Sequence, residues 1–264
     1  MKAAAGLLAL LLLAAVWIPV KAGGAHNPFM IQQLKSDTAT GAYSFIVTGD
    51  NRDGDAVFER ILRRGRDYSP RFMLHTGDFV AAGGQADYQR FRSLLARADY
   101  PVLPVIGNHD AQGQGRRWYA RYFGETEFAF RYGKDHFIFV DNAGYQVSAT
   151  QRQRLARLLK EPARYRFVIM HMPPGNLIWF HSFTQGSQET MRVLEAHNAN
   201  YVFLGHIHIF DKNTFRGVNY LISGGAGAPL YRMPLYFSDR GGAYHHFTLI
   251  QVSGAGIKDT VIKL

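Results

Sequence analysis

Residues 43–78 read YSFIVTGDNRDGDAVFERILRRGRDYSPRFMLHTGD, and this stretch decides the fold. Its apolar ends, residues 43–49 and 71–77, have the composition of short buried β-strands. Residues 55–66 between them have the apolar periodicity of an amphipathic helix. A strand, a helix and a strand in this order predict two parallel neighbours joined by a crossover. The Gly-Asp pair that ends each strand therefore lies where functional groups collect in layered α/β domains.

The same alternation continues along the rest of the chain. We predict helices over 85–98, 148–160 and 188–197, a strand over 102–107, an antiparallel hairpin of 127–132 and 136–140, and strands over 166–170, 201–204, 220–222, 245–252 and 260–264. The later strands would form a second sheet packed on the first, so the pattern predicts an α/β sandwich with helices outside. No repeat or long linker divides it, which favours one domain over residues 43–264.

The first 22 residues have the composition of a secretory signal. Lys2 precedes an apolar stretch over residues 3–20, and Val20-Lys21-Ala22 offers small residues at the cleavage positions. Residues 23–42 would then be an N-terminal extension. The alternative is an uncleaved membrane anchor, because 18 apolar residues lie at the short limit of a spanning helix of roughly 20. Either way we expect export, to the periplasm, to the medium or to the outer face of the inner membrane.

Charge and cysteine content limit the partners and the metal ligands. The formal charge of +10 favours anionic partners such as phosphorylated metabolites, lipid headgroups or nucleic acid. The arginines recur at helical spacing, which is typical of solvated helix faces, so we expect no specific nucleic-acid partner. The chain has no cysteine, so any metal ion must be held by oxygen and nitrogen atoms.

Short polar clusters follow the apolar runs and together hold residue types that bind metal ions. The candidate ligands are Asp50, Asp78, Asn108, His171, His206 and His208. A divalent cation needs several such donors from separate chain positions, and strand ends in one sheet bring side chains close together. Alternation in a strand would put His206 and His208 on one face. Taken singly, each has a structural alternative: Gly-Asp is a common turn, Asn108 could cap a helix, and His171 could be held by hydrogen bonds at a strand end.

Two rarer strings, Gly107-Asn108-His109-Asp110 and Gly205-His206-Ile207-His208, occur after Asp50 and Asp78 in the chain. With these motifs in this order, the chain resembles the calcineurin-like metallophosphoesterase family from about residue 43 to residue 264. The resemblance implies a four-layer α/β/β/α sandwich of two mixed sheets flanked by helices. It also implies hydrolysis of phosphate mono- or diesters by attack of a metal-bound hydroxide.

The resemblance further implies two divalent metal ions, with Mn, Fe, Zn, Co and Ni all compatible with the ligand types. Asp78 would bridge them. Its implied partners are Asp50 and His208 at the first metal and Asn108, His171 and His206 at the second. His109 would touch the phosphate or protonate the leaving oxygen, and Asp110 would orient His109.

Position 52 departs from the family pattern. The commonest form has Asp-any-His, whereas this chain has Asp50-Asn51-Arg52, and a protonated guanidinium offers no lone pair. The purple acid phosphatase branch, which also lacks that histidine, gains a tyrosine at the place of Ala81. Three alternatives stay open: Asn51 or Asp53 supplies the missing ligand, water fills the gap, or the first-metal site is weak or empty.

Arg52 itself has two interpretations. It is either a planar clamp for a phosphate oxygen, and so a catalytic and substrate-binding residue, or one side of a structural salt bridge to Asp53 or Asp55. His181 lies in the loop after His171, and we predict that it reaches the substrate, with Trp179 and Phe180 in the pocket wall. His75 is predicted to be a core histidine, and His245 and His246 to belong to a late strand.

Three functions follow, in order of preference. The first is an exported metal-dependent phosphoesterase acting on a phosphorylated small molecule or lipid. The second is a degenerate single-metal member of the fold that binds an anionic phosphate ligand without turnover, as the residue at position 52 suggests. The third, resting on net charge alone, is a module that binds nucleic acid or an anionic membrane, and such a module has no need for six convergent ligands.

Overall fold

The computed structural model describes residues 24–37, 41–175, 179, 181–232 and 236–264. The expected leader over residues 1–22 and the predicted wall residue Phe180 lie outside the described residues. Within the described ranges, no helix is both long and apolar enough to cross a bilayer.

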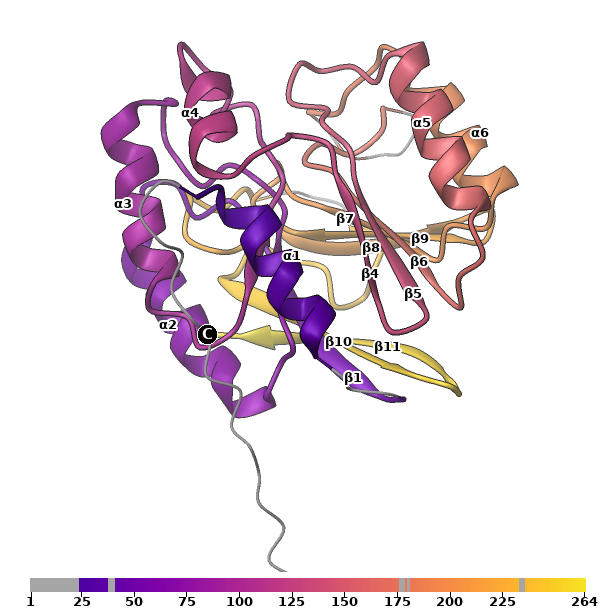
Figure 1. Ribbon diagram of the computed structural model, residues 1–264, viewed down its shortest axis with the longest axis horizontal. Coiled ribbons are helices and arrows are strands. Elements are labelled where there is room, and N and C mark those ends of the chain that lie inside the picture. The colour runs from indigo at the N-terminus through magenta and orange to yellow at the C-terminus, as the bar shows by residue number, and fades with distance from the viewer. Residues whose placement is uncertain (1–23, 38–40, 176–178, 180, 233–235) are drawn as a thin grey trace, which may run out of the picture.

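Two mixed sheets lie face to face in the middle of the molecule (Figure 1). The first has the order β11-β10-β1-β2-β3 and consists of β1 (Tyr43–Thr48), β2 (Met73–His75), β3 (Val102–Pro104), β10 (His246–Ser253) and β11 (Gly256–Lys263). The second has the order β4-β5-β6-β7-β9-β8 and consists of β4 (Ala129–Tyr132), β5 (Asp135–Phe139), β6 (Arg166–Ile169), β7 (Tyr201–Leu204), β8 (Phe210–Phe215) and β9 (Val218–Ser223). Each sheet contains a run of parallel neighbours: β1, β2 and β3 in the first, and β5, β6, β7 and β9 in the second.

The core between the sheets is aromatic, and β1 shows how the sequence produces it. Phe45 and Val47 face the second sheet, whereas Ile46 between them faces the helices that cover the first, as alternation along a strand requires. The ring of Phe45 packs edge-on against Phe137 and Phe167 of the facing sheet, with centroids 5.4 Å apart in both cases. Burial on both faces explains why the sequence of β1 is almost wholly apolar.

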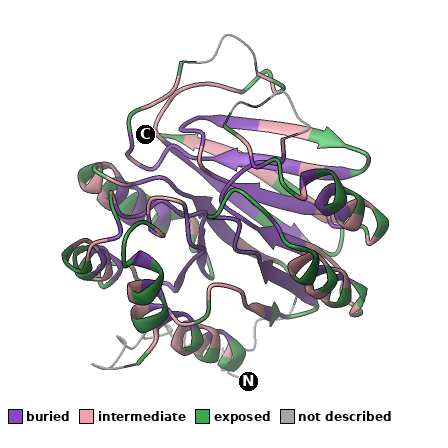
Figure 2. Ribbon diagram, turned by 90° about the horizontal axis from the view of Figure 1, so that it is seen from above, coloured by how far each residue is buried: buried purple, intermediate pink, exposed green. Residues whose placement is uncertain are grey.

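Helices cover the outer face of each sheet. The first sheet is covered by α2 (Asp55–Gly65), the short 3₁₀ helix η1 (Arg66–Tyr68), α3 (Gln85–Leu95) and α4 (Gly115–Tyr122), and the second by α5 (Ala149–Lys160) and α6 (Ser187–Ala196). Figure 2 shows buried strands in the centre and exposed helix faces at the periphery. The predicted α/β/β/α sandwich is therefore confirmed.

One helix lies where the sequence indicated only an extension. Helix α1 (His26–Ser36) packs on β3 and β4, and His26 and Asn27 at its start are buried. His26 Nε2 donates to the carbonyl oxygen of Val102 at 2.8 Å. Residues 26–36 are thus part of the folded unit, and because β3 and β4 belong to different sheets, α1 spans the edge of the sandwich (Figure 1).

Candidate metal centre

The predicted ligands lie in loops that leave the carboxyl ends of parallel strands. Asp50 follows β1, Asp78 follows β2 and Asn108 follows β3, while His171 follows β6 and His206 follows β7. Because these strands end at the same side of the sandwich, loops from both sheets meet there.

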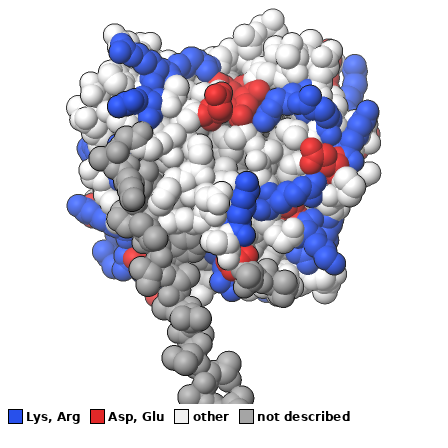
Figure 3. All heavy atoms as spheres, in the orientation of Figure 1, with Lys and Arg blue, Asp and Glu red and all other residues white. Residues whose placement is uncertain are grey.

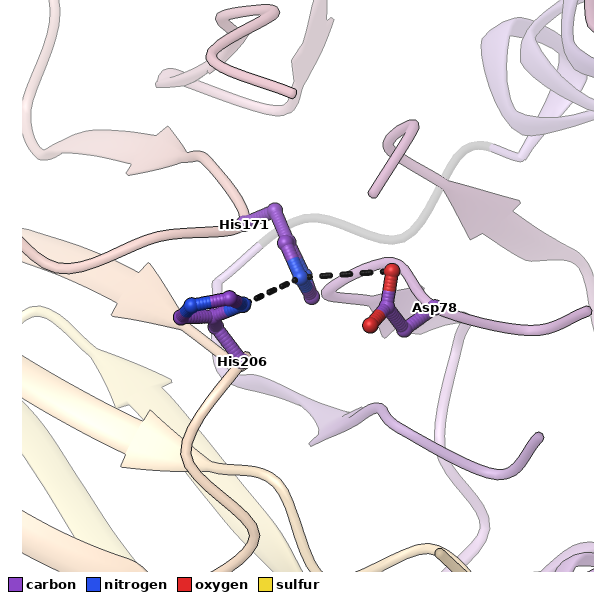
Figure 4. A group of neighbouring side chains, drawn as sticks. All are labelled: Asp78, His171 and His206. Carbon is purple, nitrogen blue, oxygen red and sulfur yellow. Dashed lines mark hydrogen bonds and ion pairs between the residues drawn. The ribbon is translucent and has the colours of Figure 1, made fainter. Parts of the chain in front are cut away.

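Asp78, His171 and His206 point toward one another (Figure 4), and their ligand atoms all lie within 4.8 Å of one another. His171 Nε2 lies 3.3 Å from Asp78 Oδ1 and 3.2 Å from His206 Nδ1. The side-chain oxygen of Asn108 lies 3.1 Å from the same nitrogen. The structure thus gathers the four residues predicted for the second metal, three of them histidine or aspartate.

The protonation of His171 shows that these four residues fit a cation. Its Nδ1 lies 2.8 Å from the carbonyl oxygen of Thr76, and since a carbonyl only accepts, this nitrogen carries the proton. In the neutral ring Nε2 then presents a lone pair, and it meets lone pairs of Asp78, Asn108 and His206 at one point. Such an arrangement suits a divalent metal ion with oxygen and nitrogen ligands.

The electrostatics of the cluster favour positive charge at the same place. Burial alone would lower the pKa of His171, but the Asp78 carboxylate, and after it Asp50, outweigh burial and raise the pKa to about 9. Burial would raise the pKa of Asp78, yet the attraction of His171 holds it well below its usual range. Burial, followed by repulsion from His171, lowers the pKa of His206 to about 3. A proton and a metal ion therefore compete for the His171 nitrogen, while His206 stays neutral as a ligand must.

The residues predicted for the first metal, Asp50, Asp78 and His208, form a less complete set of ligands. His208 donates its Nδ1 proton to the Pro229 carbonyl oxygen at 2.6 Å, so its Nε2 lone pair faces the Asp50 carboxylate, 3.7 Å away. Both oxygens of Asp50 also accept from the His206 backbone N–H, each at 3.0 Å. Among the described residues, Asp50, Asp78 and His208 do not form a cluster as tight as the one around His171.

Neither predicted substitute completes this set. Asn51 is fully buried, but its oxygen accepts from His75 Nε2 at 2.9 Å. Its amide nitrogen, which is no ligand, has no hydrogen-bond partner in the described part of the chain. Asp53 is more than half exposed and lies 3.8 Å from Arg52. The hydrogen bond also explains His75, which is buried in β2 as predicted.

The Arg52 side chain lies near two carboxylates, those of Asp53 and Asp78. Its Nε lies 3.9 Å from Asp78 Oδ2, and this nitrogen is buried without a hydrogen-bond partner among the described residues. Only 19% of the side chain is exposed. Of the two salt bridges predicted for Arg52, the structure contains the one to Asp53, whereas Asp55 pairs with Arg90 instead. A charged donor without a partner at the edge of a cation site is the arrangement that an anionic ligand would satisfy.

His109 is oriented by a backbone carbonyl and not by Asp110. Its Nδ1 donates to the carbonyl oxygen of Ala81 at 2.7 Å, and its Nε2 faces Asp78 Oδ2 at 4.0 Å. Ala81 thus acts through its backbone at the position where the purple acid phosphatase branch carries a tyrosine side chain. The predicted contact of His109 with the phosphate or the leaving group stays a prediction.

The predicted role of Asp110 is therefore wrong as a direct contact. Its buried carboxylate accepts four backbone N–H groups: those of Asp78 and Gly107 at Oδ2 and those of Phe79 and Val80 at Oδ1. The physical reason is that two loops direct buried backbone N–H groups at the same point, and a carboxylate has enough lone pairs to accept from all of them. Asp110 fixes the backbone that carries Asp78.

The alternation argument for His206 and His208 was also wrong. Strand β7 ends at Leu204, and residues 206–209 form consecutive bends in which Ile207 N donates to Gly205 O and Ile209 N to Ile207 O. His206 has a φ of 67°. The two rings converge on the site because the chain coils there, not because they share a strand face.

Left-handed backbone is concentrated at this centre. Asp50, Asp78 and His206 have φ values of 61°, 54° and 67°, and His181 and Tyr145 have values of 54° and 60°. Non-glycine residues rarely adopt this conformation, and where it persists the surrounding contacts enforce it. The fold thus holds these side chains in place at a local cost.

The loop after His171 brings one predicted residue to the centre. The His181 ring lies 6.3 Å from that of His206 and 5.9 Å from that of Tyr231, centroid to centroid. Trp179 is buried and donates its indole N–H to Asp211 at 2.8 Å, which ties this loop to β8. His181 therefore borders the site, and its contact with substrate stays a prediction.

Asn142 and Tyr145, which the sequence reasoning missed, also belong here. Asn142 is fully buried; its oxygen accepts from the backbone N–H groups of His171 and Met172, and its amide donates to the Met172 carbonyl. Tyr145 lies beside His206, with ring centroids 6.0 Å apart. The signal was available, because Asp141 and Asn142 follow the apolar run of β5 as the other polar clusters follow their strands.

Comparison with known proteins agrees with this geometry. The model of the family described as calcineurin-like phosphoesterase matches residues 43–210. The 3′,5′-cyclic adenosine monophosphate phosphodiesterase CpdA of Haemophilus influenzae is 26% identical over 58% of this chain. The match spans 61% of that relative's length.

Solved structures share the fold at low identity. The purple acid phosphatase PPD1 of yellow lupin (Lupinus luteus) superposes with a TM-score of 0.70 at 14% identity, covering 85% of this chain and 52% of that one. GAP50, described as the anchor in the inner membrane complex of Plasmodium, superposes with a TM-score of 0.65 at 13% identity, covering 85% of each chain. At these identities the likeness concerns the fold alone.

Proposed function

The chain belongs to the calcineurin-like phosphoesterase family, and from this premise we propose that it hydrolyses phosphate esters of small molecules at the centre around His171. The observation that carries the proposal is the convergence of Asp78, Asn108, His171 and His206 on one point, with Arg52 and His109 beside it. No covalent intermediate is required of the chain.

In the proposed site, Asp78, Asn108, His171 and His206 hold a divalent metal ion, which supplies Lewis-acid polarisation of the phosphoryl group and activation of water. The Thr76 carbonyl oxygen holds the His171 ring and the His109 backbone N–H holds the Asp78 carboxylate before substrate arrives, so little reorganisation is needed.

Arg52 and His109 carry the chemistry that the metal ion does not. The unpartnered Nε of Arg52 donates to a phosphate oxygen, and its fixed positive charge offsets charge on the phosphoryl group. His109 has its Nδ1 proton committed to Ala81, so when doubly protonated it gives up the proton at Nε2, on the side that faces Asp78. It thereby acts as the general acid for the leaving oxygen.

We further propose one well-held metal ion and a second that is weak or absent. Two observations support this: among the residues that the structure describes, no third strong ligand clusters with Asp50 and His208, and the Arg52 guanidinium brings a permanent positive charge next to Asp78. The metal identity among Mn, Fe, Zn, Co and Ni is left to measurement.

The first experiment tests the metal mechanism. The purified protein, metal-stripped and then loaded with Mn²⁺ or Zn²⁺, is assayed with a chromogenic phosphomonoester and its diester counterpart, a cyclic nucleotide and a phospholipid. Chelation and His206→Ala should each reduce turnover at least about 100-fold, whereas His197→Ala, a histidine at the end of α6 away from the centre, should leave it unchanged. Activity that survives both chelation and His206→Ala would refute metal-dependent hydrolysis.

The second experiment tests Arg52. Loss of a charge-assisted hydrogen bond typically costs about 1.5–3 kcal/mol, so Arg52→Ala should weaken binding of inorganic phosphate about 10- to 150-fold. Arg52→His should raise the metal content measured by mass spectrometry from one ion toward two per chain. The exposed Arg63 of α2 provides the control, as Arg63→Ala. If wild-type protein already binds two ions and neither Arg52 variant alters phosphate affinity or metal content, the proposed role of Arg52 is wrong.

The alternative function is a single-metal member of the fold that binds a phosphate-bearing ligand without turnover. Its support is the same departure at Arg52, and the first experiment separates the two, since this alternative predicts metal and phosphate binding with no hydrolysis of any ester tested. A nucleic-acid module is less well supported. Figure 3 shows Lys and Arg dispersed over the visible face with Asp and Glu between them, and not as a single basic stripe.

We also propose export, on the composition of residues 1–22. In a bacterial host, fractionation and intact mass would check this. A mature form that starts after about Ala22 indicates cleavage, the full-length mass in the membrane fraction indicates an anchor, and a full-length form in the cytoplasm contradicts export.

A further inference from the structure

A cleft of about 340 Å³ adjoins the metal centre on the side of Asn108. Its walls come from the start of the loop that follows Asn108, with Ala111 and Gln112, and from the loop that follows β5, with Ala143 and Tyr145. Because Asn108 belongs both to the cleft and to the metal cluster, a group bound in the cleft lies next to a phosphoryl group bound at the metal.

The exposure and backbone conformation of Tyr145, which lines this cleft, are not explained by packing of the fold. Half of this residue is exposed, more than any other large apolar or aromatic residue among those described. Its φ of 60° is unfavourable for an aromatic residue, and the ring lies next to His206. An exposed aromatic ring in a strained conformation beside a catalytic centre is better explained by ligand contact than by packing.

The position of this ring is fixed relative to the metal centre. Tyr145 N donates to the Asn142 carbonyl, and the Asn142 side chain binds the backbone of His171 and Met172. The loop that carries the aromatic ring is therefore tied to the loop that carries a predicted metal ligand. A ligand can use this wall without first having to order it.

The charge of the cleft limits what it can bind. Among the described residues that line the cleft, the one charged residue is Arg116. This guanidinium is already paired with Asp141 through two hydrogen bonds of 2.5 and 3.2 Å. The remaining lining is apolar or uncharged. The volume lies at the small end of ligand pockets, which suits one ring system better than a second phosphate or a long acyl chain.

We propose that this cleft receives the leaving-group side of the ester and selects a flat, uncharged ring by stacking it on Tyr145. The inference rests on the proposed hydrolysis at the metal centre and deepens it by naming the substrate class. Aryl groups and nucleobases share the required chemistry, and the test separates them. Stacking of a ring on an aromatic side chain typically contributes about 5- to 150-fold in affinity.

The test measures binding to the Mn²⁺-loaded protein by titration calorimetry, so it does not depend on turnover. Phenylphosphonate and methylphosphonate carry the same head group and differ in the ring, and adenosine 5′-monophosphate and ribose 5-phosphate differ in the base. Wild-type protein should bind the ring-bearing member of at least one pair about 10-fold more tightly. That preference should fall below about 2-fold in Tyr145→Ala and persist in Tyr145→Phe.

Phe215→Ala is the matched control, because Phe215 is also an exposed aromatic residue, at 39%, but lies at the far end of β8. A preference in both pairs supports recognition of any flat ring, and a preference in the nucleotide pair alone supports a nucleobase. The proposal is overturned if neither pair shows a preference, if the preference survives Tyr145→Ala, or if none of the four ligands binds. Ring-dependent binding without hydrolysis of any ester would instead refute the proposed function and leave the cleft assignment standing.

Discussion

Asp211 holds the loops beside the metal centre, and replacing it with asparagine should loosen them. Its buried carboxylate accepts four hydrogen bonds, two at each oxygen. Oδ2 accepts from the Trp179 indole at 2.8 Å and from Phe237 N at 2.9 Å, and Oδ1 accepts from Lys212 N at 2.8 Å and from Ser238 N at 2.9 Å. One carboxylate thus ties β8 to the loop that carries Trp179 and to the loop that carries Phe237 and Ser238.

The size of the effect follows from this geometry. In Asp211→Asn one oxygen becomes an amide nitrogen, and in either orientation of the amide two of the four donors lose their acceptor and face another donor. Each unsatisfied buried N–H costs about 1–3 kcal/mol, so the free energy of unfolding should fall by about 2–6 kcal/mol.

Urea unfolding of the metal-stripped protein measures this loss without the stabilisation that a bound metal would add. In a background that carries both Trp17→Phe and Trp118→Phe, Trp179 is the one tryptophan left in the sequence and reports on the loop directly, and we expect red-shifted emission and faster acrylamide quenching. Asp99→Asn, at an exposed aspartate, is the control. A loss below about 0.5 kcal/mol with unchanged Trp179 emission would refute the reasoning, because it would mean that water or neighbouring groups satisfy the freed donors.

Two further predictions concern stability elsewhere in the fold. Burial of His26 in α1 lowers its pKa to about 4, so the unfolded chain binds the proton more readily than the folded one as pH falls from 6.5 to about 4. The free energy of unfolding of the wild-type protein, measured relative to His26→Gln, should therefore drop by about 3 kcal/mol as the pH falls through this window. Thermal unfolding in a pH series measures the difference, and a difference that does not change with pH would contradict the prediction. Gly54→Ala should lower the free energy of unfolding by about 1–3 kcal/mol and weaken metal binding, because a Cβ there would overlap the backbone of Gly227. Gly254→Ala, with open space around it, should be near neutral in the same unfolding and metal-binding assays. Equal effects of the two substitutions would contradict the packing argument.

The strands and the composition of the site could be predicted because both depend on local patterns. Apolar runs of β1 and β7 end at Gly-Asp and Gly-His, and the parallel order of the strands then brings these ends together. The sequence also showed that Arg52 cannot be a ligand, since this depends only on the chemistry of the side chain.

What the sequence did not reveal depends on contacts between distant segments. Helix α1 has weak amphipathic patterning, and its burial depends on β3 and β4, which lie far along the chain. Helix α4 was not predicted because its arginines mask its apolar residues. Strand β8 was missed because only its first two residues are fully buried. The role of Asp110 was misjudged because the amides it binds are backbone groups, which leave no trace in residue types.

The left-handed backbone at Asp50, Asp78 and His206 has a practical consequence for attempts to stabilise this protein. Each such residue holds roughly 1–3 kcal/mol of conformational strain that glycine would relieve. A screen that selects for thermal stability alone will therefore favour glycine at these three positions, and each gain in melting temperature will remove a predicted ligand. Thermal stability and metal affinity should be measured together in any library built on this scaffold, because both depend on these three residues.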